Sequence, residues 1–448
     1  MNTITMPSTA ALASRASAFT PSTSAWKMAI TYAVLLPLLF FGARGSFSFE
    51  YQDLNNGTVG AYGGLAIPSS GSGSLTHTIE MLGIYGLAVL AMLPMWKQIL
   101  QTGLENKLVF ALPILALLST AWSQEPSRTA AFAILALINT FFAIYLSRRF
   151  PPAQQMEIFL LAGTVLAVAS LLVVALLPQA GIDHKNVAIG WQGVFPHKNI
   201  CAIVMVSFLL PALATRFTGS LGQIRRVLYI LLVTVLIAGT TSRTGWIAGV
   251  LCIFCVYLLN RLRRFRRMER GLVFLSLPLA LGGLVWLVVL NAQDLLALLG
   301  KNSTLTGRTV IWAAALMSVV KRPLLGFGYS AFWIGFKGEA VNLALATGYA
   351  GLGNAENGVL QLWLEIGLVG VAVLFLMLLR TCKNAATCFR ADSPGYVIWY
   401  ISLLFLTLLA LVDGDKFMVP HAIEWTMYIL ADVGLAMEAQ RLRVLQTA

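Results

Sequence analysis

Charged side chains are scarce in this chain. Asp, Glu, Lys and Arg together make up 11% of the 448 residues, and there are only 4 histidines. Hydrophobic residues make up 58% of the sequence, and the mean hydropathy is +0.79. A water-soluble domain of this size needs a far more charged surface, so the composition excludes a soluble globular protein and indicates an integral membrane protein.

Cysteine is also rare, with 5 residues in the whole chain, all in or beside apolar stretches: Cys201, Cys252, Cys255, Cys382 and Cys388. The pair at 252 and 255 has the spacing of a redox or metal site, but it lies inside a hydrophobic run without nearby histidine. We therefore interpret these cysteines as small apolar packing residues. The sequence does not indicate a framework of disulfides.

Acidic residues are outnumbered, 18 against 31 basic ones, which gives a formal net charge of +13. The basic residues are divided among many loops rather than gathered on one face, so we expect no nucleic-acid partner. The basic run from Arg261 to Arg270 is predicted to be cytoplasmic by the positive-inside rule and to lie against anionic membrane lipids. Counting outward from this run places both termini in the cytoplasm.

Apolar runs long enough to cross a bilayer recur along the chain. They predict an all-α, polytopic membrane protein with about twelve transmembrane helices. The runs are 28–43, 79–96, 106–121, 129–147, 156–177, 199–215, 227–240, 244–260, 272–290, 357–380, 396–412 and 418–437. The predicted organisation is a disordered cytoplasmic tail (1–26), helices one to nine (27–290), an extracytoplasmic active-site loop (291–356), helices ten to twelve (357–438) and a cytoplasmic tail (439–448). We interpret the first apolar run as an uncleaved anchor.

The loop at 291–356 is the longest predicted interruption of this pattern. It is too long for a turn and too rich in Trp, Phe and Gly for an idle linker, which is typical of a functional loop. A short helix is predicted from about 309 to 321, capped by Thr306 or Thr309 and stopped by Pro323. It would lie flat on the membrane or form the roof of a cavity. The glycines that follow, at 348, 351 and 353, predict a pliable return segment.

Two arginines are predicted to lie outside the membrane, where the positive-inside rule disfavours them. Arg243 sits in a minimal turn, and Arg308 follows Gly307 at the start of the predicted short helix. Each has an alternative interpretation, Arg243 as an interfacial anchor and Arg308 as part of a surface ion pair. Because a guanidinium binds phosphate oxygens bidentately, two of them together predict a site for a pyrophosphate.

Other external polar groups have two interpretations each. His197 and Lys198 contact phosphate or sugar, or they cap and anchor the helix that begins there. Arg128 is a substrate contact or an interfacial anchor. Glu356 is a general base for a sugar hydroxyl, or a carboxylate that complements a helix N-terminus.

Two carboxylate features lie deeper or later in the chain. Glu365 is predicted to be an intramembrane carboxylate, which merits a functional test. Asp413-Gly414-Asp415 resembles a metal-binding pair, but an acidic turn between two helices explains it, so we expect no metal and no cofactor.

Six short segments carry a resemblance to a known family. They are Leu118-Ser119-x-x-Trp122-Ser123, Gly193-Val194-Phe195-Pro196-His197-Lys198-Asn199, Ser242-Arg243-Thr244, Gly307-Arg308-Thr309-x-x-Trp312, Arg322-Pro323-Leu324-Leu325-Gly326-Phe327-Gly328, and Asn357-Gly358-x-Leu360 followed by Glu365-x-Gly367. In this order they resemble the bacterial O-antigen ligase and polysaccharide polymerase superfamily, with exopolysaccharide repeat-unit polymerases as the nearest branch.

The resemblance implies a multi-helical membrane fold with an extracytoplasmic loop over a central cavity. It also implies transfer of a glycan from an undecaprenyl pyrophosphate donor without metal or nucleotide. By resemblance, the arginines that bind the pyrophosphate are Arg243 and Arg308. The family usually has His before Asn-Gly where this chain has Glu356. The base is therefore Glu356 or His197, or the step needs little help from a base.

We expect a glycosyltransferase that polymerises lipid-linked repeat units at the outer face of a bacterial cytoplasmic membrane. Its expected partners are the lipid-linked donor, a glycan acceptor, membrane lipids, and the flippase and chain-length regulator of the same pathway. Further substrate contacts are expected at Lys198, Arg128, Asn199, Asn357 and Trp312, with sugar stacking on Trp191, Trp312, Phe332 and Trp333. The alternatives are a ligase that moves a finished glycan to a lipid or protein acceptor, and a secondary transporter, whose site would lie at the bilayer midplane.

Overall fold

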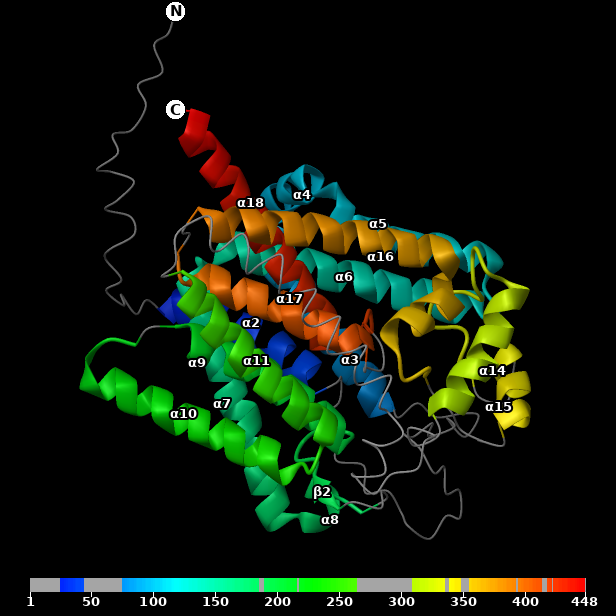
Figure 1. Ribbon diagram of the computed structural model, residues 1–448, viewed down its shortest axis with the longest axis horizontal. Coiled ribbons are helices and arrows are strands. Elements are labelled where there is room, and N and C mark those ends of the chain that lie inside the picture. Colours follow the sequence, from blue (N-terminus) through cyan, green and yellow to red (C-terminus); the bar gives the residue numbers. More distant parts are fainter. Residues whose placement is uncertain are drawn as a thin grey trace, which may run out of the picture.

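A computed structural model describes residues 25–43, 75–184, 189–215, 217–263, 308–334, 338–347, 354–391, 394–412, 417–420 and 422–447. These residues form a bundle of helices, shown in Figure 1, with one two-stranded antiparallel pair, β1 (Ile182–Asp183) and β2 (Gly190–Trp191). The all-α prediction therefore agrees with the described part of the chain. The short pair closes a loop and forms no layer of its own.

Most of the helices follow the apolar runs of the sequence. The helices are α2 (Ala25–Gly42), α3 (Leu75–Met92), α4 (Trp96–Glu105), α5 (Ala111–Leu118), α6 (Pro126–Arg149), α7 (Pro152–Leu176), α8 (Pro178–Gly181), α9 (Lys198–Ala214), α10 (Gly219–Gly239), α11 (Arg243–Leu262), α14 (Arg308–Lys321), α15 (Glu339–Thr347), α16 (Gly358–Arg390), α17 (Tyr396–Val412) and α18 (Ile423–Thr447). Short 3₁₀ turns, η1 (Leu93–Met95), η2 (Lys107–Phe110) and η3 (Ser119–Trp122), join α3 to α4, α4 to α5 and α5 to α6.

Within the described residues, 6 helices are long and apolar enough to cross a membrane. They are Ile79–Glu105, Pro126–Arg149, Pro152–Leu176, Gly219–Gly239, Arg243–Leu262 and Gly358–Arg390. Shorter apolar helices cover Lys107–Trp122, Lys198–Ala214, Val310–Lys321 and Tyr396–Val412. The chain is thus a multi-pass membrane protein, while twelve as the number of spans stays a prediction.

Several predictions fall outside the described residues. They concern the tail before residue 25, the loop before α3, the apolar run 272–290, most of the Arg-rich run after Arg263, the glycines at 348, 351 and 353, and Asp413-Gly414-Asp415.

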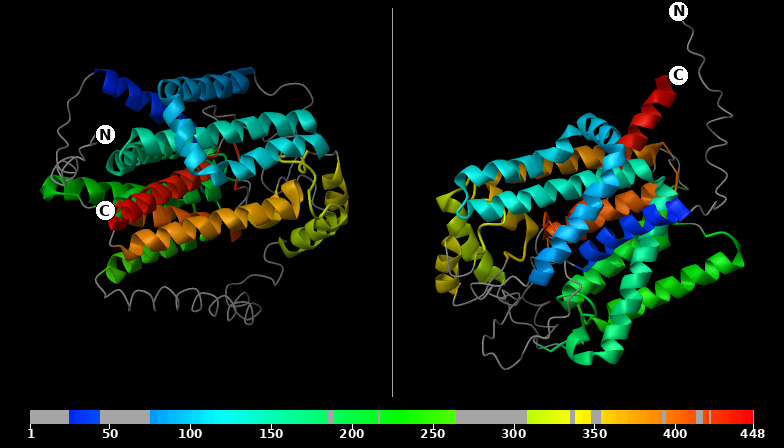
Figure 2. Two further views of the ribbon diagram at one scale, coloured as in Figure 1. Left: turned by 90° about the horizontal axis from the view of Figure 1, so that it is seen from above. Right: turned by 180° about the vertical axis from the view of Figure 1, so that it is seen from behind.

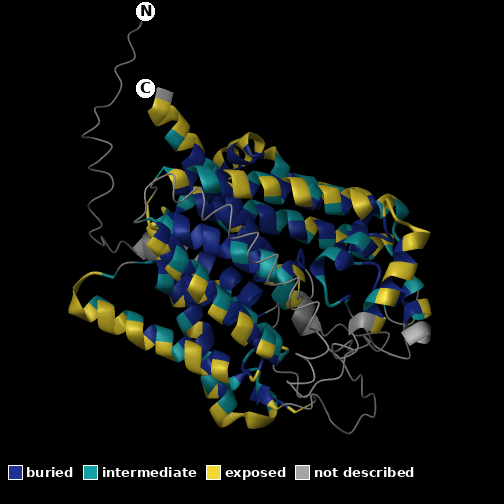
Figure 3. Cartoon of the chain, viewed as in Figure 1, coloured by how far each residue is buried: buried dark blue, intermediate teal, exposed yellow. Residues whose placement is uncertain are grey.

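The centre of the bundle is formed by α17 and α18. Helix α18 packs on α6, α16 and α17, and α17 also packs on α9 and α11. Trp399, Trp425, Tyr400 and Tyr428 are at most 1% exposed. Helix α17 is apolar on all sides, which is typical of a helix surrounded by others. Figure 3 shows α17 almost wholly buried, whereas α10 at the periphery is lined with exposed residues.

One end of the bundle carries α14 and α15. Figures 1 and 2 show the N-terminal ends of α6 and α16 lying beside them, while the C-terminal ends of α16 and α18 lie at the opposite end. The helix predicted near 309–321 is confirmed as α14, which ends before Pro323. Helix α15 was not predicted. It is joined to α14 by an ion pair between Lys321 and Glu339 at 2.5 Å.

Candidate functional site

Helix α16 is broken at Gly367. The glycine has φ 76° and ψ −173°, so the helix is interrupted inside an apolar segment. A side chain here would be strained because φ is positive, and a Cβ would also lie only 2.1 Å from the carbonyl oxygen of Leu324. The break therefore requires glycine and places residues 323–328 directly against the helix.

Residues 323–328 satisfy the hydrogen bonds that the break leaves open. The N–H groups of Phe327 and Gly328 donate to two carbonyls of α16 at 2.9 and 2.8 Å. Beyond the break, the N–H of Leu368 donates to the carbonyl of Pro323 at 2.9 Å. Non-helical backbone at membrane depth is stable only when protein or trapped water satisfies it. The Pro-Leu-Leu-Gly-Phe-Gly motif thus has a structural role, which is to hold the loop in the break of α16.

The turn before α6 holds the other side of this loop. Ser119 Oγ accepts a hydrogen bond from the N–H of Tyr329 at 3.0 Å, and Trp122 donates from Nε1 to the carbonyl of Leu325 at 2.8 Å. Thr129 Oγ1 donates to the carbonyl of Tyr329 at 2.8 Å. The Ser-x-x-Trp-Ser motif therefore packs against a segment about 200 residues later in the chain.

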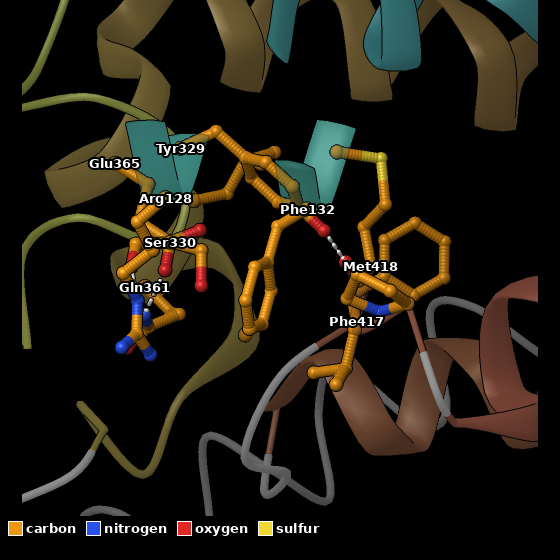
Figure 4. A pocket seen from close by; sticks show the side chains of 12 residues that line it. Arg128, Phe132, Tyr329, Ser330, Gln361, Glu365, Phe417 and Met418 are labelled. Carbon is orange, nitrogen blue, oxygen red and sulfur yellow. Dashed lines mark hydrogen bonds between the residues drawn. The ribbon is translucent and has the colours of Figure 1, made fainter. Parts of the chain in front are cut away.

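A cavity of about 140 Å³ lies where α6, the loop and α16 meet the turn before α18. Figure 4 shows the side chains that line it. They include Arg128, Phe132, Tyr329, Gln361, Glu365 and Phe417. Polar groups and aromatic rings are therefore combined in one cavity, which is the composition of a small-molecule site.

The carboxylate of Glu365 is part of a buried hydrogen-bond network. Glu365 is buried, at 7% exposure, and its Oε1 accepts from Gln361 Nε2 at 2.6 Å. Gln361 Oε1 in turn accepts from Trp333 Nε1 at 2.8 Å and from the N–H of Ala355 at 3.0 Å. The carboxylate thereby fixes which way the amide of Gln361 points, and through it the backbone just before Glu356.

Arg128 faces the same cavity. Its Nε donates to the carbonyl of Ser330 at 2.9 Å, and its guanidinium carbon lies 5.0 Å from the centre of the Phe132 ring. Within the described part of the chain its two terminal nitrogens have no hydrogen-bond partner. They are available to a ligand.

The phenol of Tyr329 closes one side of the cavity. Burial raises its pKa well above the ordinary value, and the negative charge of Glu365 raises it further. The neutral hydroxyl donates to the carbonyl of Met418, drawn as a dashed line in Figure 4. This bond joins the long loop to the turn between α17 and α18.

The predicted base, Glu356, lies in a tight turn before α16. Its φ is +51°, a left-handed conformation that is rare for a residue other than glycine and is found preferentially at functional sites. Its N–H donates to Asn354 Oδ1 at 2.7 Å. Asn357 caps α16 by accepting from the N–H of Leu360 at 2.9 Å, and its amide donates to the carbonyl of Val412 at 3.2 Å. The predicted substrate contact at Asn357 therefore has a structural role.

The aromatic residues predicted to stack on sugars have different environments. Phe332 and Trp333 are 0% and 4% exposed in an apolar core beneath the loop, so the prediction that they contact sugar is wrong for the structure described. Trp312 is half-buried and donates to the carbonyl of Ala355 at 3.0 Å. The ring of Trp191 packs against the backbone at Gly239.

His197 is the N-cap of α9 and has both ring nitrogens engaged. Nδ1 accepts from the N–H of Asn199 at 3.2 Å, and Nε2 lies 3.5 Å from Asp183 Oδ2. This arrangement fixes the tautomer with the proton on Nε2 and leaves no free lone pair for a general base. Lys198 is also buried, at 6% exposure. The geometry thus favours the capping interpretation for this segment.

Arg243 is the first residue of α11, after the tight turn that follows α10. Ser242 caps the helix by accepting from the N–H of Gly245 at 3.2 Å. The Arg243 side chain is exposed and has no hydrogen bond or ion pair among the residues described. Arg308 begins α14, but its side chain lies outside the described residues, as do the contacts that would test the predicted arginine pair.

The structure thus divides the predicted site residues between two regions. Arg128, Glu356, Asn357 and Trp312 lie on or near the elements around the cavity. His197, Lys198, Asn199 and Arg243 lie at the starts of α9 and α11, and α17 packs against both these helices and α16.

Gln361 was not among the predicted site residues. The signal available for it was its position four residues before Glu365, which places both side chains on one face of a helix. No group of three or more possible metal-ligating side chains occurs among the described residues, but Asp413 and Asp415 lie outside them.

Comparisons with known proteins agree with the sequence resemblance. A family model described as O-antigen ligase matches residues 228–375. The exopolysaccharide production protein ExoQ of Rhizobium meliloti (strain 1021) is 25% identical over 313 residues, which cover 67% of this chain and 70% of that protein. A chain in a solved structure of a peptidoglycan synthase complex is 20% identical to this one. The match covers 76% of this chain and 96% of the chain in that structure. Its TM-score of 0.34 is too low to support an argument.

The family match begins inside α10 and ends inside α16, so it contains Arg243, Arg308, the docked loop and the break at Gly367. Together with the similarity to an exopolysaccharide production protein, it supports the resemblance of this chain to the O-antigen ligase and polysaccharide polymerase superfamily.

Proposed function

We propose that this chain is a membrane glycosyltransferase that polymerises undecaprenyl-pyrophosphate-linked repeat units at the outer face of the bacterial cytoplasmic membrane. The family supports a membrane enzyme of exopolysaccharide or O-antigen synthesis. One observation supports the proposed reaction in particular. The segment that matches the family model contains both the exposed Arg243 and the buried carboxylate of Glu365. An enzyme that binds both a pyrophosphate and a sugar needs groups of these two kinds.

The proposed reaction is a single displacement at the anomeric carbon of the donor sugar. The acceptor hydroxyl oxygen forms the new glycosidic bond as the bond from the anomeric carbon to the pyrophosphate oxygen breaks. The bonding pair leaves with undecaprenyl pyrophosphate, and the configuration inverts. Arg243 and Arg308 neutralise the charge that grows on the pyrophosphate, which is the largest electrostatic change in the step.

Glu356 is the better candidate for the base that takes the hydroxyl proton. Both nitrogens of His197 are engaged by the α9 N-terminus and by Asp183, whereas Glu356 is half-buried on a turn with left-handed backbone. A carboxylate held in that conformation is costly for the chain, so a role in chemistry explains its presence.

The test is complementation of a deletion strain with Arg243→Ala and Arg308→Ala. We expect loss of long polymer of at least tenfold and accumulation of single repeat units on the lipid carrier. The control is Arg322→Ala. Arg322 directly follows α14, and among the described residues its guanidinium bonds to the carbonyl of Trp122 and faces the ring of Phe327. Normal chain length in both test variants would refute the pyrophosphate clamp.

A ligase is the second candidate, because the matching family model is described as O-antigen ligase. The same chemistry would then transfer a finished glycan to a lipid or protein acceptor. The deletion strain separates the two functions. Loss of long chains indicates a polymerase, whereas long chains retained on the lipid carrier indicate a ligase.

A further inference from the structure

We propose that the cavity between Arg128 and Glu365 is a subsite for one sugar ring of the acceptor glycan. The inference rests on the proposed function and deepens it by naming what the cavity binds. Segments far apart in the sequence form its walls, and the carboxylate of Glu365 is held there at 7% exposure. A buried carboxylate inside an apolar helix is costly, and such residues usually mark a functional site.

The charges select the class of ligand. The terminal nitrogens of Arg128 are donors without a described partner, and the carboxylate of Glu365 is an acceptor on the same cavity. A phosphate would satisfy the guanidinium but would be repelled by the carboxylate. An apolar group would leave the guanidinium nitrogens without an acceptor. A sugar carries hydroxyls that accept from the guanidinium and donate to a carboxylate, so it can bind both groups at once.

The apolar part of the lining agrees with a sugar ring. Phe132 and Phe417 contribute aromatic rings, and Tyr329 adds a third. Aromatic rings provide flat apolar surfaces against which the C–H face of a sugar packs. The cavity is small, at about 140 Å³, and this suits a single ring better than a longer stretch of glycan.

The hydrogen-bond network connects this cavity to the proposed base. Gln361 binds Glu365 through its amide nitrogen and the N–H of Ala355 through its oxygen, and Glu356 is the next residue. A sugar ring bound by Glu365 therefore lies next to the turn that carries Glu356. The hydroxyl of the acceptor must reach the base, so we assign this ring to the acceptor glycan and not to the donor.

The test uses a probe without pyrophosphate. The repeat-unit oligosaccharide, released from its lipid by mild acid, is titrated into the full-length protein in nanodiscs, and binding is measured by calorimetry. The test variants are Glu365→Gln and Arg128→Lys. Glutamine keeps an acceptor oxygen for Gln361 but removes the charge, and lysine keeps the charge but removes the planar fork. We expect each variant to bind at least tenfold more weakly than the natural protein.

Arg322→Lys is the matched control, and it should bind the oligosaccharide like the natural protein. Thermal unfolding of each variant shows whether it is folded. Unchanged affinity in both folded test variants would overturn the subsite, as would a natural protein that polymerises normally but binds no oligosaccharide. A strain that lacks this protein but still makes normal polymer would refute the proposed function. Weakened oligosaccharide binding by both variants would still support the sugar subsite in that case.

Discussion

At the scale of single residues, two titratable side chains in similar positions have different surroundings and therefore different roles. His197 and Glu356 both precede a helix at the same predicted surface. The imidazole uses its two nitrogens for the start of α9 and for Asp183, at 3.2 and 3.5 Å. Glu356 instead lies on a left-handed turn whose helix is capped by its neighbour, Asn357. The cap of α16 is thus supplied by Asn357 and not by the carboxylate of Glu356.

Replacing His197 separates its two interpretations. Asparagine is a strong helix N-cap and has no group that titrates near neutral pH, so His197→Asn keeps the cap and removes any base. We expect the variant to retain polymer synthesis within about threefold. His197→Ala should lower stability by about 1 kcal/mol because it removes the cap. Polymer length in cells and thermal unfolding of the purified variants measure both effects, and an inactive but stable His197→Asn would reinstate the histidine as the base.

At the scale of elements, the long loop and α16 depend on each other. The loop supplies donors and acceptors to the helix break, and the helix positions the loop beside the cavity. Neither has its backbone satisfied alone. A membrane helix with this break is stable only with the loop in place.

Gly367→Ala tests this mutual dependence. Alanine at φ 76° is strained, and its Cβ would overlap the carbonyl of Leu324. We expect a loss of stability of about 2 kcal/mol or more, faster proteolysis between α14 and α16, and loss of polymer synthesis. Thermal unfolding and limited proteolysis measure the first two effects.

Gly86→Ala is the control for that experiment. Gly86 lies in α3, and a Cβ there would meet nothing within 4 Å. This exposed helical position should gain up to about 1 kcal/mol from the helix propensity of alanine. Equal stability of the natural protein and Gly367→Ala would show that the break does not need glycine.

At the scale of the whole molecule, the basic loops predict which end of the bundle faces the cytoplasm. The end that carries α14, α15 and the cavity is predicted to face outward. The test introduces Ser127→Cys into a variant without the natural cysteines. Ser127 is an exposed residue near the start of α6, at the end of the bundle that carries the cavity. We expect a membrane-impermeant maleimide to label the introduced cysteine fully in intact spheroplasts.

Ser220→Cys, an exposed position near the start of α10, is predicted to lie on the opposite side. It should be labelled only after the membrane is permeabilised. The reverse pattern would place the cavity in the cytoplasm and exclude a lipid-linked donor from the outer leaflet.

Some residues of the candidate site could be predicted from the sequence, and others could not. Glu365 was recognisable because it interrupts an apolar run, and the helix after Arg308 was recognisable from Pro323 at its end. The contact of Arg128 with Ser330, about 200 residues away, gives no local signal. Phe332 and Trp333 are aromatic residues of the kind that stack on sugars, but whether such a ring is exposed depends on what packs over it. Here residues of α14, α15 and α16 bury both.

The sequence by itself determined the class of protein and the positions of most described helices. It could do so because transfer into a bilayer depends on the apolar content of one continuous segment. Only the tertiary structure decided that α16 breaks at Gly367, that the loop fills the break, and that Arg128 and Glu365 share a cavity. These features depend on hydrogen bonds and packing between distant segments, and such partners exist only once the chain has folded.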